Sequence, residues 1–217
     1  FHYLWHLFFS KKFLSLMPNF DIEDSYNLPI IAGIDEAGRG PLCGPVFASC
    51  CVVNKEFYPK DADDSKKISE LKREKIFSNI LELEKDKKLF FGIGTSSVDE
   101  IENLNIRNAT KLAMKRAYLN LLEKYNIKVD IVIVDGNFIP DIDVKADYVI
   151  KGDQKSISIA VASIIAKVSR DNLLRQMDLE FPQYMWRKNK GYGTKEHMEA
   201  IKKYGICKYH RKSFIHI

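Results

Sequence analysis

The feature that most constrains this chain is an apolar run, residues 30–34, that ends abruptly in two adjacent carboxylates, Asp35 and Glu36. Such a run indicates a buried strand, and ionised carboxylates at its end are costly unless something positive lies beside them. A Gly-Arg-Gly turn at residues 38–40 follows at once, and its glycines let the backbone approach a ligand closely. A hard divalent cation would neutralise the two carboxylates, and a phosphate backbone beside it would accept hydrogen bonds from the glycine-rich turn. The alternative interpretation is a solvated acidic turn at the end of a strand.

Composition and charge fit one globular domain, with room for a small appendage. The chain has 217 residues, 46% of them apolar, and a net charge of +5. Positive charge is concentrated in residues 184–217, which carry nine Lys or Arg against two Glu, so a polyanionic partner is permitted. No apolar run approaches the length of a membrane span. The four cysteines lack Cys-x-x-Cys spacing, which favours small buried thiols in a reducing compartment, and we expect a cytoplasmic protein.

Residues 1–16 are aromatic and aliphatic and contain no acid. A membrane-proximal helix, an organellar presequence and translated upstream sequence are the alternatives. We favour the last, with Met17 as the initiator, and expect deletion of this segment to leave activity and stability nearly unchanged. Residues 18–29 are expected to form a linker or a short helix packed outside the core, so residues 1–29 together make an N-terminal extension.

Apolar periodicity predicts strands and helices along most of the remaining chain. Ser69 is expected to cap a helix with a defined apolar face. The order of elements predicts a mixed sheet with helices on its faces. The expected strands are residues 30–35, 46–53, 89–97, 129–136 and 148–150. The expected helices are the one after Ser69, with Leu71, Ile76, Ile80, Leu81 and Leu83 on its apolar face, then residues 98–104, 106–125, 156–179 and 195–204, with a basic, aromatic loop at 185–194.

Three acidic sites follow these predicted strands: Asp35 with Glu36, then Asp135, then Asp153. If the strands that end at Asp35 and Asp135 are parallel neighbours, their ends lie about 5 Å apart. Taken singly, Asp153 could be a helix N-terminal charge, and Asp135 with Gly136 could be a turn. Together, converging carboxylates bind Mg²⁺ or Mn²⁺ through oxygen. Two such ions can hold the attacking water and the leaving oxygen of an in-line phosphodiester cleavage.

At this point the chain closely resembles the ribonuclease HII family, the type 2 ribonucleases H. Several independent motifs in family order are far more specific than any one of them. They extend over about residues 30–214 and are GIDEAGRGP (33–41), DSKK (64–67), IRNAT (106–110), VDGN (134–137), KGD (151–153), ASIIAKVSRD (162–171), NKGYGT (189–194) and HRKSF (210–214).

The resemblance implies a ribonuclease H-like α/β fold, a five-stranded mixed sheet flanked by helices with a C-terminal helical extension. It assigns residues 30–217 to the catalytic domain, with the basic helical part beginning at about residue 182. It also implies a metal-dependent endonuclease that cuts the RNA strand of RNA–DNA hybrids. The family further cuts 5′ of single ribonucleotides in duplex DNA, leaving a 3′-OH and a 5′-phosphate. The implied catalytic and metal-binding carboxylates are Asp35, Glu36, Asp135 and Asp153.

The resemblance also implies a substrate-binding surface. Its 2′-OH-reading segment matches Gly38, Arg39 and Gly40, and its sugar-stacking tyrosine matches Tyr192. The residue types are consistent with these roles. The 2′-OH distinguishes RNA from DNA, so a tight turn could read it through its backbone. An aromatic ring in a basic loop is suited to stacking on a nucleotide. The alternative for Tyr192 is an ordinary surface tyrosine.

Further polar residues near these motifs are candidate contacts. Ser65, Lys66 and Lys167 are reasonable phosphate contacts, although lysines are often only solvated. His197 and His210 are expected to be structural or phosphate-facing, because the carboxylates already suffice as metal ligands. We expect a monomer that binds RNA–DNA hybrids and ribonucleotide-containing DNA, and no membrane. The competing hypotheses are another ribonuclease H-like nuclease, such as a resolvase, and a catalytically silent nucleic-acid-binding module.

Overall fold

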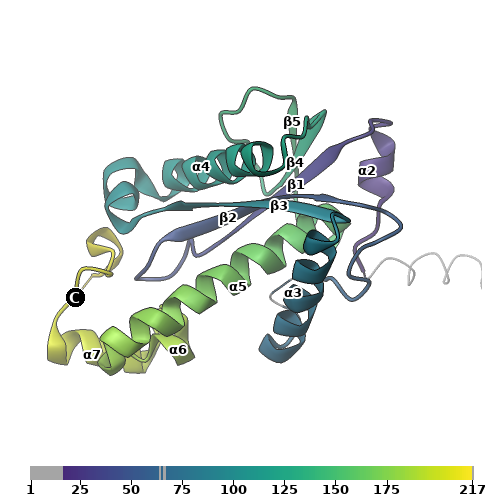
Figure 1. The fold of residues 1–217 in the computed structure, drawn as a ribbon. Helices are drawn as coiled ribbons and strands as arrows, with labels where there is room; N and C mark the ends of the chain where they lie inside the picture. The colour runs from purple at the N-terminus through teal and green to yellow at the C-terminus, as the bar shows by residue number, and fades with distance from the viewer. Residues whose placement is uncertain (1–16, 64, 66, 217) are drawn as a thin grey trace, which may run out of the picture.

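The computed structural model describes residues 17–63, 65 and 67–216 (Figure 1). Residues 1–16 and Lys66, which carried two of the expectations above, lie outside the described residues. The strands are β1 (Ile31–Ala37), β2 (Val46–Val53), β3 (Leu89–Ser96), β4 (Ile131–Asp135) and β5 (Ala146–Val149). The main helices are α2 (Asp21–Ser25), α3 (Glu70–Lys85), α4 (Val98–Tyr125), α5 (Ile157–Glu180), α6 (Trp186–Asn189) and α7 (Lys195–Tyr204), with short 3₁₀ turns at Gly152–Gln154, Pro182–Tyr184 and Lys212–Phe214.

The five strands form one mixed sheet in the order β3-β2-β1-β4-β5, which confirms the expected fold. The hairpin-like run β1-β2-β3 is antiparallel, and β4 and β5 add parallel to β1. Ile34 pairs with Val134 in the register of β1 and β4. The next residue of each strand is an aspartate, so Asp35 and Asp135 lie side by side at the point where β4 ends and β1 continues alongside β2.

Helices cover both faces of the sheet (Figure 1). On one face α4 packs over a core that includes Ala32 and Ile34 of β1. On the other face lie α3 and α5, and α5 approaches β1 so closely that a Cβ on Gly33 would clash with the backbone of Ser158. Because side chains alternate along a strand, the residues of β1 are divided between an α4 side and an α5 side.

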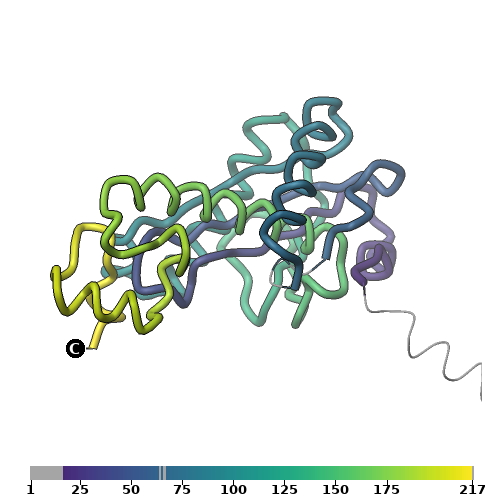
Figure 2. The backbone as a smooth tube through the Cα atoms, turned by 90° about the horizontal axis from the view of Figure 1, so that it is seen from below, coloured from purple at the N-terminus to yellow at the C-terminus, as the bar shows by residue number. Residues whose placement is uncertain are grey.

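The C-terminal part packs on the second half of α5 and lies at one end of the molecule, away from α2 (Figure 2). It has a small core of its own, made from α5, α6, α7 and the turn after β1. That core contains Cys43, Leu174, Met177, Tyr184, Trp186, Ala200 and Ile201. At the opposite end, Glu23 of α2 is buried and accepts hydrogen bonds from the Ser156 and Ser158 hydroxyls at the start of α5.

Most expected elements are confirmed, and the differences have local causes. The predicted break before residue 106 is a kink inside α4, where Asn105 has a φ of 65°. Ser69 caps α3 as expected, but Leu71 and Leu81 are exposed, so that part of the predicted apolar face is wrong. The predicted loop at 185–194 contains the short helix α6.

Three of the four cysteines are buried and all four are free thiols, as expected. Among the described residues, no helix is long and apolar enough to cross a membrane.

Candidate active site

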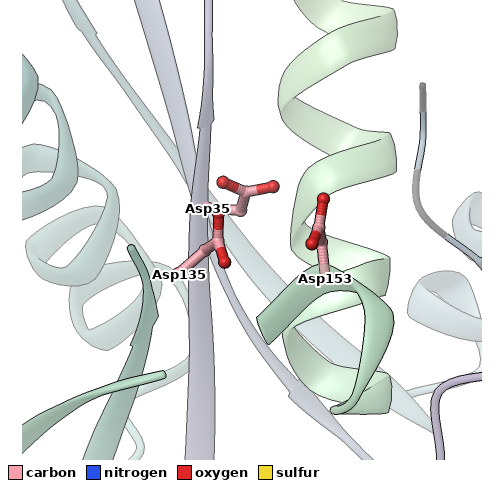
Figure 3. A group of neighbouring side chains, drawn as sticks. All are labelled: Asp35, Asp135 and Asp153. Atoms are coloured by element: carbon pink, nitrogen blue, oxygen red, sulfur yellow. The ribbon is translucent and has the colours of Figure 1, made fainter. Parts of the chain in front are cut away.

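Three aspartates from distant parts of the chain meet near the C-terminal ends of the central strands β1 and β4. Asp35 lies in β1, Asp135 ends β4, and Asp153 lies in the 3₁₀ turn that precedes α5. One carboxylate oxygen from each lies within 4.8 Å of the others (Figure 3). Asp35 and Asp153 are buried, whereas Asp135 is partly exposed. The sequence therefore predicted correctly that these three acids converge.

Backbone N–H groups orient two of these carboxylates. Asp35 Oδ1 accepts from the N–H of Glu36 at 2.7 Å, and Asp135 Oδ1 accepts from the N–H of Gly152 at 2.6 Å. The space around Gly152 is tight, because a Cβ there would lie 2.5 Å from Ile159 Cδ1 and 3.4 Å from Asp135 Oδ1, so a larger residue would require the Ile159 side chain to move. Gly152 therefore links the end of β4 to the turn that carries Asp153.

The donor set fits a hard divalent cation. Three carboxylates this close repel one another when ionised, and a cation among them offsets that repulsion. All three offer oxygen, the ligand type of Mg²⁺ and Mn²⁺, and none offers the sulfur or imidazole typical of zinc sites. Asp35, Asp135 and Asp153 are therefore the residues placed to hold a metal.

Glu36 falls outside this group of three, although the sequence predicted four acids together. The cause is strand alternation, since Asp35 points to the α5 side of β1 and its neighbour points to the α4 side. Glu36 instead forms an ion pair with Arg39 at 3.3 Å and lines the adjoining cavity. Glu36 is next to Asp35 in the chain, but its side chain lies on the other face of the strand.

A cavity of about 400 Å³ adjoins the position of Asp35, because the next two residues, Glu36 and Ala37, line it. It brings together most of the substrate-binding residues that the sequence predicted, from four separate segments. Three further residues that were not predicted, Ala37, Ile106 and Arg170, complete its wall. The predicted residues in the wall are Glu36, Gly38, Arg39, Gly40, Ser65, Lys167 and Tyr192.

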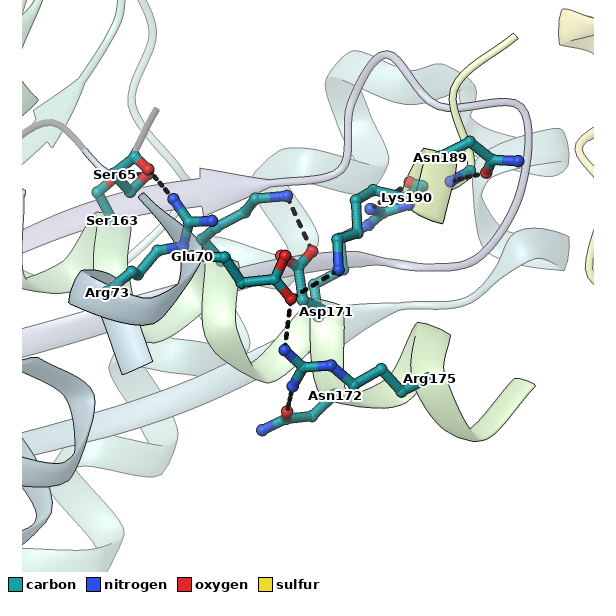
Figure 4. A network of polar contacts seen from close by, with 12 residues as sticks. Ser65, Glu70, Arg73, Ser163, Asp171, Asn172, Arg175, Asn189 and Lys190 are labelled. Carbon is teal, nitrogen blue, oxygen red and sulfur yellow. Dashed lines mark hydrogen bonds and ion pairs between the residues drawn. The ribbon is translucent and has the colours of Figure 1, made fainter. Parts of the chain in front are cut away.

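Ser65 reaches this cavity from a buried position and Lys167 from a partly buried one. The Ser65 hydroxyl lies 2.8 Å from that of Ser163 in α5, and Arg73 of α3 donates to the Ser65 carbonyl. Lys167 forms an ion pair with Asp171 at 2.8 Å, and burial lowers the pKa of Lys167. Figure 4 shows Ser65 beside Ser163 and Arg73, with Asp171 further along α5. Each side chain is thus held in place by the protein itself.

Two buried arginines, which sequence reasoning did not single out, shape the Gly-Arg-Gly turn. Arg211 donates to the carbonyls of Gly38 at 2.7 Å and Arg39 at 3.0 Å. Arg170 donates to the carbonyls of Cys43 at 3.0 Å and Lys190 at 3.1 Å. Burial lowers the pKa of both guanidinium groups. The turn therefore keeps its shape through charged donors that satisfy carbonyls on its inner side.

Tyr192 stands at the open side of the cavity. Its side chain is 49% exposed, and a Cβ on Gly40 would lie 3.6 Å from its ring. The N–H of Leu42 donates to the Gly191 carbonyl at 2.8 Å, which joins the tyrosine loop to the Gly-Arg-Gly turn. An exposed ring on an anchored backbone is suited to stacking against a nucleotide.

Lys190, next to this loop, is held by an acid from α3. Its Nζ lies 2.9 Å from Glu70, which also pairs with Arg175 at 2.5 Å. Figure 4 shows Glu70 between the two cations. These cations lower the pKa of Glu70 to about 2. The ion pair ties the start of α3 to the loop that carries Tyr192.

Further cations gather around the ring of Phe138, next to Arg39. The Arg39 guanidinium lies 5.3 Å from the ring centroid, Arg107 5.6 Å and Lys111 6.0 Å. Two of these, Arg107 and Lys111, project from α4. They extend the positive surface beyond the cavity, and sequence reasoning quoted Arg107 without giving it a role.

The fold and this site define a ribonuclease H-like hydrolase, built around acids at the edge of a mixed sheet. The family model for ribonuclease HII matches residues 32–217, and the chain belongs to the ribonuclease HII family. A ribonuclease HII from Caldanaerobacter subterraneus subsp. tengcongensis is 49% identical over 188 residues, which cover 87% of this chain and 75% of the relative. One from Pelagibacter ubique is 50% identical over 188 residues, which cover 86% of this chain and 96% of the relative.

Solved structures with lower identity show the same fold. Ribonuclease H2 from Pyrococcus horikoshii OT3 superposes with a TM-score of 0.65 at 22% identity, covering 85% of this chain and 93% of the other. Bst-RNase HIII in complex with Mn²⁺ superposes with a TM-score of 0.66 at 16% identity, covering 85% of this chain and 67% of the other. Family membership makes the chain a ribonuclease, an endonuclease of the hydrolase class, and implies divalent-metal-dependent RNase H activity on RNA–DNA hybrids.

Proposed function

We propose that this enzyme cuts the RNA strand of hybrids and also cuts on the 5′ side of a single ribonucleotide embedded in duplex DNA. The products would be a 3′-OH and a 5′-phosphate. The observation that carries this proposal is the position of the Gly38–Gly40 turn and Tyr192 in one cavity that also includes Glu36, the neighbour of Asp35 in the aspartate group. A group that distinguishes ribose from deoxyribose would then lie next to the group that cleaves.

Asp35, Asp135 and Asp153 would hold two Mg²⁺ or Mn²⁺ ions, with Glu36 as a further acidic partner from the α4 side. When bound, such ions polarise the phosphate and lower the pKa of water, so that hydroxide forms near neutral pH. The Mn²⁺ in the complex of Bst-RNase HIII supports a site of this kind. The backbone donors to Asp35 and Asp135 keep these carboxylates aimed inward before any ion binds.

The other residues would recognise and place the substrate. The Gly38–Gly40 backbone would contact the ribose 2′-OH, because this turn lines the cavity and Arg211 fixes its Gly38 and Arg39 carbonyls. The Tyr192 ring would stack on the sugar of the following nucleotide. Ser65 and Lys167, with Lys66 next to Ser65 in the sequence, would contact the phosphates. All described groups come from one chain, so we expect a monomer.

The same reasoning extends to the organisation of the chain. We propose that residues 30–217 act as one catalytic domain, because the cavity takes Gly38 from the turn after β1 and Tyr192 from the part beyond Pro182. Residues 1–29 would then be an extension, with α2 docked on the start of α5.

The deciding experiment is cleavage of a DNA duplex that carries one ribonucleotide, with both product ends mapped. We expect a single cut 5′ of the ribonucleotide with Mg²⁺ or Mn²⁺, no cut in the all-DNA duplex, and loss of cleavage with Asp135→Asn. Cleavage of an all-DNA four-way junction, without cleavage at the ribonucleotide, would instead favour a resolvase-like nuclease. Binding without cleavage under every metal condition would favour a silent module.

A further inference from the structure

The two buried histidines of the C-terminal part form a hydrogen-bonded chain that ends on the backbone of Tyr192. His197, in α7, is fully buried, and His210 is 2% exposed. His197 Nδ1 lies 2.9 Å from the Tyr192 carbonyl oxygen, and the two Nε2 atoms lie 3.2 Å apart. The rings pack against Tyr184 and Trp186 in the C-terminal core.

The neighbours of His197 fix the position of its proton. The indole N–H of Trp186 can only donate, and it points at His197 Nε2 over 3.1 Å. Nε2 must therefore be an acceptor without a proton, which places the proton of the neutral ring on Nδ1. Nδ1–H then donates to the Tyr192 carbonyl, which also accepts the N–H of Thr194 at 2.8 Å.

The tautomer of His210 follows from its neighbours in the same way. The backbone N–H of Cys207 donates to His210 Nδ1 at 3.0 Å. His210 therefore carries its proton on Nε2, which donates to His197 Nε2. Every ring nitrogen of the pair thus has one defined role. Burial lowers the pKa of both histidines, that of His210 to about 4, which keeps the two rings neutral at pH 7.

We propose that His197 is a positioning residue for the ribonuclease reaction, which holds the Tyr192 carbonyl through Nδ1–H with its tautomer set by Trp186 and His210. This inference rests on the proposed stacking role of Tyr192. The loop is fitted closely on its other side, where a Cβ on Gly191 would lie 2.8 Å from Cys43 Sγ and one on Gly193 would lie 3.0 Å from Leu42. His197 supplies an anchor on the side of the C-terminal core, and the phenol ring remains exposed toward the substrate.

The first test is the tautomer itself, measured in the intact wild-type protein. Two-bond ¹H–¹⁵N correlations of the imidazoles at neutral pH should show the Nδ1–H form for His197 and the Nε2–H form for His210. Exposed His216 should show exchange between forms and serves as the internal reference. An Nε2–H form of His197 would overturn the proposal, whatever the substrate of the enzyme is.

The second test compares two variants that remove the imidazole in different ways. Asparagine places its amide nitrogen one bond from Cγ, as Nδ1 is, so His197→Asn can still donate to the Tyr192 carbonyl. His197→Gln places its amide one bond further out, toward Trp186, and loses that donor. We expect kcat on a single-ribonucleotide duplex to fall about 5- to 100-fold in His197→Gln, with KM little changed. His197→Asn should retain most of the wild-type kcat, although both variants lose the packing of the imidazole ring.

A double-mutant cycle separates positioning from a general loss of structure. If His197 acts through the tyrosine ring, adding His197→Gln to Tyr192→Ala should lower kcat by less than about a further twofold. Fully additive losses, or equal losses in the Asn and Gln variants, would overturn the proposal. Failure of wild-type protein to cut at the ribonucleotide would refute the proposed function instead, and the tautomer result would still stand. His216→Gln is the control for substitution at an exposed histidine.

Discussion

At the scale of single residues, Asp35 and Glu36 show how neighbours in the sequence can have different surroundings. Strand alternation sends Asp35 to the α5 side, where it meets two other aspartates within 4.8 Å. Glu36 goes to the α4 side and pairs with Arg39 at 3.3 Å. The sequence predicted that the aspartates meet, because parallel strand ends share an edge. It placed Glu36 among them because adjacency in the motif does not reveal the face of the strand.

The first prediction concerns Asp135→Asn. The amide oxygen can still accept from Gly152, so the fold should persist while one metal-ligand charge is lost. We expect kcat to fall by about 10²–10³-fold or more, the scale of removing one group that stabilises the transition state. In metal-free buffer the melting temperature should rise, because one of three repelling charges is gone. A wild-type turnover number at saturating Mg²⁺ would contradict this assignment.

The second prediction concerns the ring of Tyr192. Stacking on a base or sugar is worth about 1–3 kcal/mol by alanine substitution. If this energy is expressed in the transition state, Tyr192→Ala should lose about ten- to a hundredfold in kcat/KM. Tyr192→Phe should lose less, since the ring remains. Steady-state assays on a single-ribonucleotide duplex and on a long hybrid provide the comparison, and equal losses on both substrates would leave Tyr192 as a general positioning residue.

Residues that act through buried hydrogen bonds could not have been found in the same way. Arg170 and Arg211 donate to carbonyls of the Gly38–Gly44 turn, which lies more than a hundred residues away in the chain. A carbonyl acceptor belongs to the backbone, so it leaves no trace in the residue types on either side. The HRKSF motif marked Arg211 as a family position, but its physical role appears only once the chain is folded.

At the scale of elements, caps and breaks were predicted well and short helices were not. Ser69 accepts the N–H of Lys72 and begins α3, as its position before an apolar run predicted. The helix α6, Trp186–Asn189, has only four residues and one buried side chain, so it has no periodicity to read. Leu71 was expected inside but is 79% exposed, because the first turn of α3 faces Arg175 and Lys190 through Glu70.

The third prediction tests that ion pair between elements. Glu70 pairs with both Arg175 and Lys190, whereas Glu74 pairs with Arg175. Glu70→Gln should therefore release Lys190 beside the tyrosine loop, and Glu74→Gln is a control with the same change in charge. We expect Glu70→Gln to bind hybrid more tightly at low salt, with a log–log salt slope steeper by about one. The melting temperature should change little, because exposed ion pairs contribute about 0–1 kcal/mol.

The binding assay is a titration of labelled hybrid in Ca²⁺ or metal-free buffer at several salt concentrations. Equal shifts in Glu70→Gln and Glu74→Gln would show that only net charge matters. An unchanged slope in Glu70→Gln would mean that Lys190 faces away from the duplex even when released.

At the scale of the whole molecule, the C-terminal part and the sheet are coupled through buried polar groups. Arg211 and the histidine pair belong to the C-terminal core, yet they contact the turn after β1 and the loop of Tyr192. The sequence showed that this part is basic and helical from about residue 182. It could not show that its buried histidines must stay neutral, because that depends on the surrounding packing.

The fourth prediction follows from this burial and concerns stability against pH. Burial, together with His197, lowers the pKa of His210 from its ordinary 6.5 to about 4, and burial also lowers that of His197. The unfolded chain takes up these protons near pH 6.5, whereas the native protein takes up the His210 proton only near pH 4. The stability that the neutral pair contributes is therefore complete above pH 6.5 and is lost as the pH falls toward 4. Each histidine can contribute a slope of up to about 1.4 kcal/mol per pH unit in this interval.

Urea unfolding in metal-free buffer between pH 7 and pH 4.5 measures this slope. Over that interval the Glu70 ion pairs stay ionised, because its pKa is about 2. His210→Gln should be less stable than wild type at pH 7 but should show a flatter decline, so the two curves converge toward acid pH. His216→Gln, at an exposed histidine, should follow the wild-type curve throughout. Because the aspartate group is common to all three proteins, its titration cancels in the comparison. Parallel curves for wild type and His210→Gln would mean that His210 takes up its proton in the native state without cost.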